Sequence, residues 1–156
     1  MTPNEKAFLN MLKISELGQG NIDISDNGYN VLAGSTPSVP RLFNDYSRHP
    51  NKPIYFAKYG VMSSAAGAYQ IIIKTWNNLQ KQLNLPDFSP DSQDAAALEL
   101  IRQRGGLEFV RAGQFADAVN ACRKEWASLP GAGAGQRENK LDDLKTAYLA
   151  AGGTIA

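Results

Sequence analysis

Apolar side chains recur along much of this chain at the three- and four-residue spacing of amphipathic helices. Near the N-terminus, Phe8 and Met11 begin such a stripe, which predicts a helix over residues 3–17. Thr2 and Glu5 stand where the two polar members of a helix-starting capping box belong. The chain is therefore expected to open with a well-defined helix.

The same spacing predicts four or five more helices in the second half of the chain, which we expect to turn helical from Ser63 onward. Ser89-Pro90-Asp91 is a strong helix start, and Gly152-Gly153 is typical of a helix end. Cys122 falls on an apolar face and is expected to be a buried small hydrophobe. The residues that define these faces are Ile72, Trp76, Leu79, Leu83, Leu98, Ile101, Phe115, Val119, Trp126, Leu129, Leu141, Leu144 and Tyr148.

Between these helical regions the pattern shortens to the alternation typical of strands. Residues 22–24 and 29–32 flank the turn signal Asp26-Asn27-Gly28, which predicts a small hairpin, and a third short strand is expected near residues 53–56. The predicted fold class is α+β, mainly α, with a small hairpin or three-stranded lobe beside a helical body.

This order of elements predicts one domain over residues 1–156. A β-lobe would cover about 20–60, and a helical lobe about 61–156 together with the N-terminal helix. Glu16 would then fall where the two lobes meet, and such a cleft is a usual place for a ligand.

Composition narrows the possible functions. The 156 residues are 43% hydrophobic and 20% charged, with a net charge of +1, which gives no general attraction to nucleic acid. No apolar run approaches the roughly 20 residues that span a bilayer, and no secretory signal is evident. With one cysteine and one histidine, we expect no metal site and no cofactor. Residues 41–86 are locally basic, which suits either a solvated surface or an anionic polymer.

Two motifs are weak candidates for chemistry. The glycine-rich segment 130–135 lacks the Lys-Ser/Thr pair of a phosphate loop and follows a helix, so we interpret it as a flexible loop between helices. His49 precedes a proline in a predicted loop and is expected to lie at the surface. No serine or cysteine stands in a recognisable nucleophile elbow near it.

Glu16 is the more informative residue because of its place in the first helix. A carboxylate in the last turn faces the negative end of the helix dipole, and partial burial also disfavours its charged form. Both effects predict a raised pKa. The alternative is an exposed glutamate that frays the end of its helix.

Several runs together resemble one family. The chain is similar over nearly its whole length to the endolysins of lambdoid phages, the lambda-type lytic transglycosylases, which have a lysozyme-like fold. The matching runs are Lys6-Ala7-Phe8-Leu9, Ser15-Glu16, Asp45-Tyr46-Ser47, His49-Pro50, residues 63–70, Asp87-Phe88-Ser89-Pro90, Ser92-Gln93-Asp94-Ala95 and residues 126–133.

The resemblance places the catalytic glutamate of the family on Glu16. It implies cleavage of the β-1,4 bond between N-acetylmuramic acid and N-acetylglucosamine without water, leaving a 1,6-anhydromuramic end. It also implies action on peptidoglycan glycan strands. The expected substrate contacts are Tyr29, Asn30, Tyr46, Ser64, Tyr69, Gln70 and Gln136.

The chain departs from the family pattern at three places. Asn30 stands where the pattern has aspartate, which removes one candidate for a second catalytic carboxylate. Ala68 replaces an arginine, and the loop over residues 35–41 is longer. The last two departures bear on substrate contacts more than on the chemistry.

Three alternatives stay open from the residues alone. A true muramidase would use Asp26 or Asp45 as a second carboxylate to activate water. A noncatalytic wall-binding protein would not need Glu16. A helical nucleic-acid binder would use the basic stretch, against the near-zero net charge.

The resemblance also implies a place of action. We expect a monomer without stable membrane association that waits in the host cytoplasm. A holin would then release it to the cell wall in the periplasm.

Overall fold

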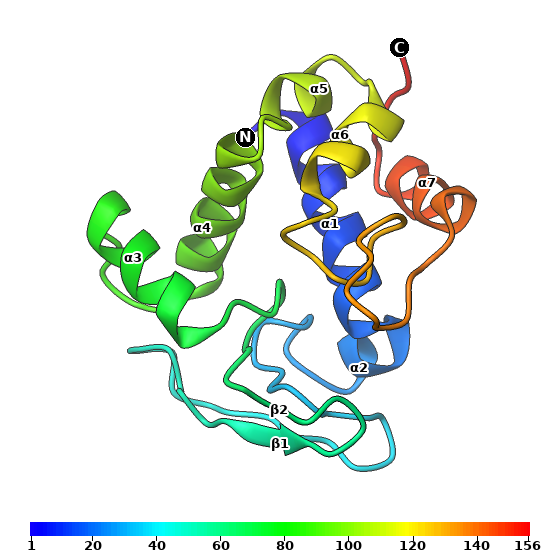
Figure 1. Cartoon of the computed structure of the whole chain (residues 1–156). Helices are drawn as coiled ribbons and strands as arrows, with labels where there is room; N and C mark the ends of the chain where they lie inside the picture. The colour runs from blue at the N-terminus through cyan, green and yellow to red at the C-terminus, as the bar shows by residue number, and fades with distance from the viewer. The chain divides into compact units, whose positions relative to one another are not determined.

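The computed structural model describes all 156 residues and confirms the mainly helical α+β class, with seven helices and one two-stranded antiparallel sheet (Figure 1). The chain divides into two compact units, one formed by residues 1–16 and 97–156 and the other by residues 17–96. No helix has the length and apolar character needed to cross a membrane.

The first helix, α1 (Pro3–Leu17), spans the predicted residues. The Thr2 hydroxyl caps it by accepting a hydrogen bond from the Glu5 backbone N–H at 3.1 Å. The predicted role of Glu5, as the second member of the capping box, is wrong. The Glu5 carboxylate instead accepts a hydrogen bond from Arg111 Nε at 2.8 Å, so it ties α1 to a distant part of the same unit.

The rest of this unit packs around α1 through aromatic side chains. The ring of Phe115 packs against those of Phe8 and Tyr148, with ring centroids 6.1 and 4.7 Å away. Cys122 is fully buried, as predicted, and burial raises the pKa of its thiol to about 12. The helices here, besides α1, are the end of α4 (Pro90–Gln103), α5 (Leu107–Arg111), α6 (Phe115–Cys122) and α7 (Leu141–Ala150).

The predicted hairpin over residues 22–32 is wrong. Residues 22–23 instead end a short helix, where the Ser25 hydroxyl donates to the Asn21 carbonyl at 2.7 Å and closes the turn. Residues 31 and 42 form only an isolated bridge. The sheet of this unit pairs β1 with β2, in the region of the predicted third strand. The unit contains α2 (Gln19–Asp23), β1 (Ile54–Phe56), β2 (Val61–Ser63), α3 (Ile73–Leu83) and the start of α4.

The chain does not turn helical at Ser63 as predicted, because residues 64–72 form a tight reversal before α3. Ala66 and Ile71 exchange two backbone hydrogen bonds, of 3.2 and 3.1 Å. Gly67 has a φ of +84° inside this reversal, a conformation that favours glycine. Small residues are used here to turn the chain, so the helix begins ten residues later than the sequence suggested.

The core of this unit also contains the histidine, which corrects the expected surface position. His49 is buried, and its ring centroid lies 4.9 Å from that of Phe88, which in turn packs on Trp76 at 4.6 Å. Its Nδ1 accepts from the Asn51 N–H, so the neutral ring donates from Nε2 to the Ile71 carbonyl at 2.8 Å. Burial lowers the pKa of this imidazole. His49 is therefore a satisfied core residue.

Gly67→Ala should test how closely this reversal is packed. A Cβ there would lie 2.3 Å from Gln93 Oε1 and 3.0 Å from the Phe88 ring, in addition to the positive φ. We expect it to lower the free energy of unfolding by about 3 kcal/mol in urea denaturation. Gly60→Ala is the matched control, because Gly60 has a positive φ but open space around it. It should cost about 1 kcal/mol. Equal losses would contradict the packing argument.

Candidate active site

Glu16 lies one residue before the end of α1 and is half-buried. Burial raises the pKa of its carboxyl to about 7, in the direction that its place in the sequence predicted. Hydrogen bonds from the hydroxyl and the backbone of Ser128 act in the opposite direction. The result is a carboxyl that can exist in both protonation states near neutral pH.

The polar neighbours of Glu16 in its own unit form a connected network. The Ser128 hydroxyl donates to Glu16 Oε2 and also lies 2.8 Å from the Ser15 hydroxyl. Asn139 Nδ2 donates to the carbonyl of Ser15 at 3.0 Å and to its hydroxyl oxygen at 3.1 Å. The carboxyl is thus bound by the Ser128 hydroxyl, which the uncharged side chains of Ser15 and Asn139 help to hold in place.

The glycine-rich segment 130–135 begins directly after this network. Glu138 folds back over it and accepts hydrogen bonds from the N–H groups of Gly131 and Gly133, at 2.8 and 3.0 Å. The backbone donors that a phosphate would use are therefore occupied by the chain's own carboxylate, in line with our interpretation of a loop. Gln136, a predicted substrate contact, is exposed in the same loop.

Three of the predicted substrate contacts are tyrosines in the unit formed by residues 17–96. The hydroxyls of Tyr29 and Tyr69 both donate to Asp94 Oδ1, at 3.0 and 2.6 Å. The Tyr46 hydroxyl donates to Asp26 Oδ2 at 2.6 Å. Burial is the main reason that the pKa values of all three phenols lie above normal, about 12 for Tyr29, so all three remain donors.

Exposure separates these tyrosines. Tyr29 and Tyr46 are half-buried, whereas Tyr69 is only 2% exposed. Tyr69 therefore serves first to orient Asp94, and its direct contact with a ligand stays a prediction.

The other predicted contacts in this unit also support the backbone. Asn30 Oδ1 accepts from the Asp26 N–H at 2.8 Å, and Ser64 Oγ accepts from the Ile73 N–H at the start of α3 at 2.9 Å. Gln70 Nε2 donates to the carbonyls of Val31 and Gly67. Each side chain shapes the unit, and their contact with substrate stays a prediction.

The sequence reasoning did not single out four residues that organise these groups. Ser15, Ser128 and Asn139 form the network at Glu16, and Asp94 joins two tyrosines. The first two and Asp94 lie inside the runs that resemble the family. No spacing rule marks the four residues, since their partners are 11 to 124 residues away in the chain. Only the folded chain brings each of them to its own hydrogen-bond partners.

The two candidates for a second catalytic carboxylate both lie in the unit formed by residues 17–96. Asp26 accepts the Tyr46 hydroxyl. Asp45 is exposed and accepts from the Ser47 N–H at 2.9 Å, and the hydrogen bonds from Ser47 lower its pKa. No group of three or more histidine, cysteine, aspartate or glutamate residues is placed to hold a metal ion.

Comparison with known proteins agrees with this fold and shows the family. A family model for endolysins matches residues 6–155. The chain is 47% identical to the endolysin of Escherichia phage P2 over 158 residues, which covers 98% of this chain and 95% of that protein. It is 44% identical to the endolysin of Escherichia phage lambda over 151 residues, covering 96% and 92%.

Solved structures give the same result. Bacteriophage lambda lysozyme in complex with a chitohexasaccharide matches with a TM-score of 0.91 and 42% identity, over 100% of this chain and 98% of that one. A second structure of lysozyme from bacteriophage lambda matches with a TM-score of 0.87. The fold is lysozyme-like, and the class is that of peptidoglycan-cleaving enzymes. This chain belongs to the endolysin family.

Glu16→Gln should change how stability depends on pH. The Glu16 pKa rises from 4.5 to about 7 on folding, so the stabilising protonated form is complete below pH 4.5 and is lost as the pH rises to about 7. Glutamine stays neutral. The variant should therefore gain stability over the wild type above pH 7, by at most about 3 kcal/mol, and not below pH 4.5.

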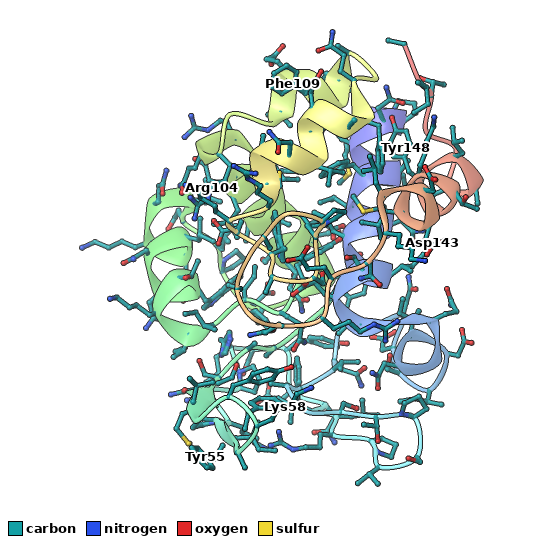
Figure 2. The ribbon with its side chains drawn as sticks, turned by 45° about the vertical axis from the view of Figure 1, so that its right-hand side comes forward. Tyr55, Lys58, Arg104, Phe109, Asp143 and Tyr148 are labelled. Atoms are coloured by element: carbon teal, nitrogen blue, oxygen red, sulfur yellow. The ribbon has the colours of Figure 1, made fainter.

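Urea unfolding at both pH extremes measures this difference. Asp143→Asn, at an exposed carboxyl on α7 (Figure 2), is the control and should show a much smaller pH-dependent change. A Glu16→Gln effect that is equal at both extremes would contradict a raised pKa.

Proposed function

We propose that this endolysin is a lytic transglycosylase that cleaves the bond between N-acetylmuramic acid and N-acetylglucosamine in peptidoglycan, with Glu16 as its acid and base. The observation that carries the proposal is the Glu16 carboxyl itself. It is half-buried, has a pKa of about 7, and is held by the Ser128 hydroxyl. Such a group is protonated often enough to act as an acid and ionised often enough to act as a base.

The first step is protonation of the leaving oxygen. Glu16 donates its proton to the glycosidic oxygen of the departing N-acetylglucosamine as the bond to C1 of the muramic sugar breaks. Burial favours this step because it disfavours the carboxylate before the reaction. The products of the step are a free hydroxyl on the leaving sugar, an electron-poor C1 and an ionised Glu16.

The second step closes a ring without using water. The Glu16 carboxylate takes the proton of the C6 hydroxyl on the muramic sugar while that oxygen attacks C1. The bond from O6 to C1 forms, and Glu16 returns to its protonated state. One proton leaves Glu16 and one returns, so a single carboxyl completes the cycle.

The setting of Glu16 supports a one-carboxyl mechanism. A hydrolase that inverts or retains needs a second carboxylate at a defined distance from the first. In its own unit, the polar groups that contact Glu16 come from a hydroxyl and a backbone amide, which stabilise the carboxylate without competing for the reaction. The replacement of an expected aspartate by Asn30 agrees with this interpretation.

We propose peptidoglycan glycan strands as the substrate. The lambda lysozyme structure contains a chitohexasaccharide, a chain of related sugars. The half-buried rings of Tyr29 and Tyr46 and the exposed Gln136 are suited to stacking on sugars and to hydrogen bonding. The basic residues between 41 and 86 would favour an anionic wall polymer. We further propose holin-dependent release to the cell wall.

The main test is mass spectrometry of soluble products from purified peptidoglycan. The wild type should release muropeptides one water lighter than hydrolysis products. Glu16→Gln should reduce their rate of formation by at least about 100-fold, because the general acid and base is lost. Full activity in this variant would exclude Glu16 as the acid and base, whereas a wild type that releases no products would belong to the noncatalytic, wall-binding class.

The control variants for this test are Asp26→Asn and Asp45→Asn. Both should retain anhydro products. Reducing-end products from the wild type, lost in one of these variants, would identify a muramidase instead.

The pH dependence of cleavage gives a separate prediction. Because Glu16 must carry a proton to start the reaction, kcat/KM, measured as the rate at low substrate concentration, should fall as the pH rises above about 7. Initial rates of turbidity loss in peptidoglycan suspensions, measured across this range, would show the decline. A rate that keeps rising well above this pKa would contradict the role of Glu16 as the acid.

A further inference from the structure

We propose that Asn139 and Ser15 are positioning residues that aim the Ser128 hydroxyl at Glu16 Oε2, leaving Oε1 as the oxygen that gives and takes the proton. The proposal deepens the function proposed for Glu16 and rests on it for the meaning of the two oxygens. It concerns a one-way chain of three hydrogen bonds that begins at a side-chain amide and ends at the carboxyl.

The direction of donation along these hydrogen bonds follows from the groups at their start. The carbonyl oxygen of Ser15 can only accept, so the nitrogen and not the oxygen of the Asn139 side chain must face it at 3.0 Å. The same nitrogen lies 3.1 Å from the Ser15 hydroxyl oxygen, which therefore accepts. Ser15 is left with its own proton to donate elsewhere.

The other end of the chain sets the same direction. A serine hydroxyl has one proton, and that of Ser128 is directed to Glu16 Oε2. In the 2.8 Å contact between the two serines, Ser128 must then accept and Ser15 must donate. The order is Asn139 to Ser15 to Ser128 to Glu16, and each donation strengthens the next.

Asn139 is itself held firmly at the base of the glycine-rich loop. Its backbone N–H donates to the Ser128 carbonyl at 2.8 Å, so the residues on either side of the loop are joined. The neighbouring Glu138 binds two N–H groups inside that loop. The amide that starts the chain is therefore fixed by backbone contacts that do not involve Glu16.

The chemical consequence is that the two carboxyl oxygens of Glu16 have different roles. Oε2 accepts from the Ser128 hydroxyl, so Oε1 is the oxygen left to carry the acidic proton. The donation also favours the charged form and opposes the effect of burial. Weakening any link should therefore make Glu16 a weaker acid.

The experiment is a titration of Glu16 by carbon NMR in protein labelled at the glutamate carboxyl carbon, with Glu16→Gln used to assign the signal. Ser128→Ala, Ser15→Ala and Asn139→Ala should each shift the titration midpoint to higher pH, most strongly for Ser128→Ala. Asn77→Ala, an exposed asparagine on α3, should leave it unchanged.

A double variant distinguishes a connected chain of hydrogen bonds from three independent contacts. If Asn139 acts through Ser128, then Asn139→Ala should add no further shift once Ser128→Ala is present. A midpoint unchanged in both Asn139→Ala and Ser15→Ala, or additive shifts in the double variant, would overturn the proposal. Should the buried Ser15→Ala fail to fold, Asn139→Ala and the double variant still decide the matter.

The titration needs no substrate, so it is independent of the proposed reaction. If Glu16→Gln kept full activity, the transglycosylase proposal would fall while the midpoints still tested the chain. If Glu16→Gln were inactive and the midpoints did not move, the reaction would stand and the positioning role would fall.

Discussion

The Glu16 carboxyl is kept half-buried at the end of α1, and the reactivity proposed for the molecule depends on that burial. Burial costs free energy whenever the group is ionised, and the hydrogen bond from Ser128 offsets part of the cost. The balance brings the pKa to about 7. A more exposed carboxyl would stay ionised, and a buried one without a donor would keep its proton.

The pKa of Glu16 therefore depends on residues that are far from it in the sequence. Ser128 must be carried to the end of α1, and it is held there by the bonds from Ser15 and Asn139. The interlocked aromatic rings of Phe8, Phe115 and Tyr148 keep α1 in a defined place within its unit. Core packing and the chemistry proposed for Glu16 are thus linked, because movement of α1 would change the distance from donor to carboxyl.

In the unit formed by residues 17–96, by contrast, several polar side chains form hydrogen bonds with the backbone and so stabilise the fold of the unit. Gln93 accepts from the Ala68 N–H and donates to the carbonyls of Tyr29 and Phe88, so one buried amide joins three segments. Asp94, next along α4, fixes two tyrosine hydroxyls. With their hydroxyls engaged, these tyrosines can offer a ligand mainly their ring faces, to the extent that they are exposed.

The sequence by itself determined the helix over residues 3–17, the start of α4 at Ser89-Pro90 and the buried place of Cys122, because these depend on local capping and on apolar spacing. It also singled out Glu16, because its position in the last turn of a helix follows from the local sequence. Only the tertiary structure decided the pairing of β1 with β2, the burial of His49 and the network of Ser15, Ser128 and Asn139. Strand partners and hydrogen bonds between distant residues depend on how the chain packs, and a local pattern contains no record of that packing.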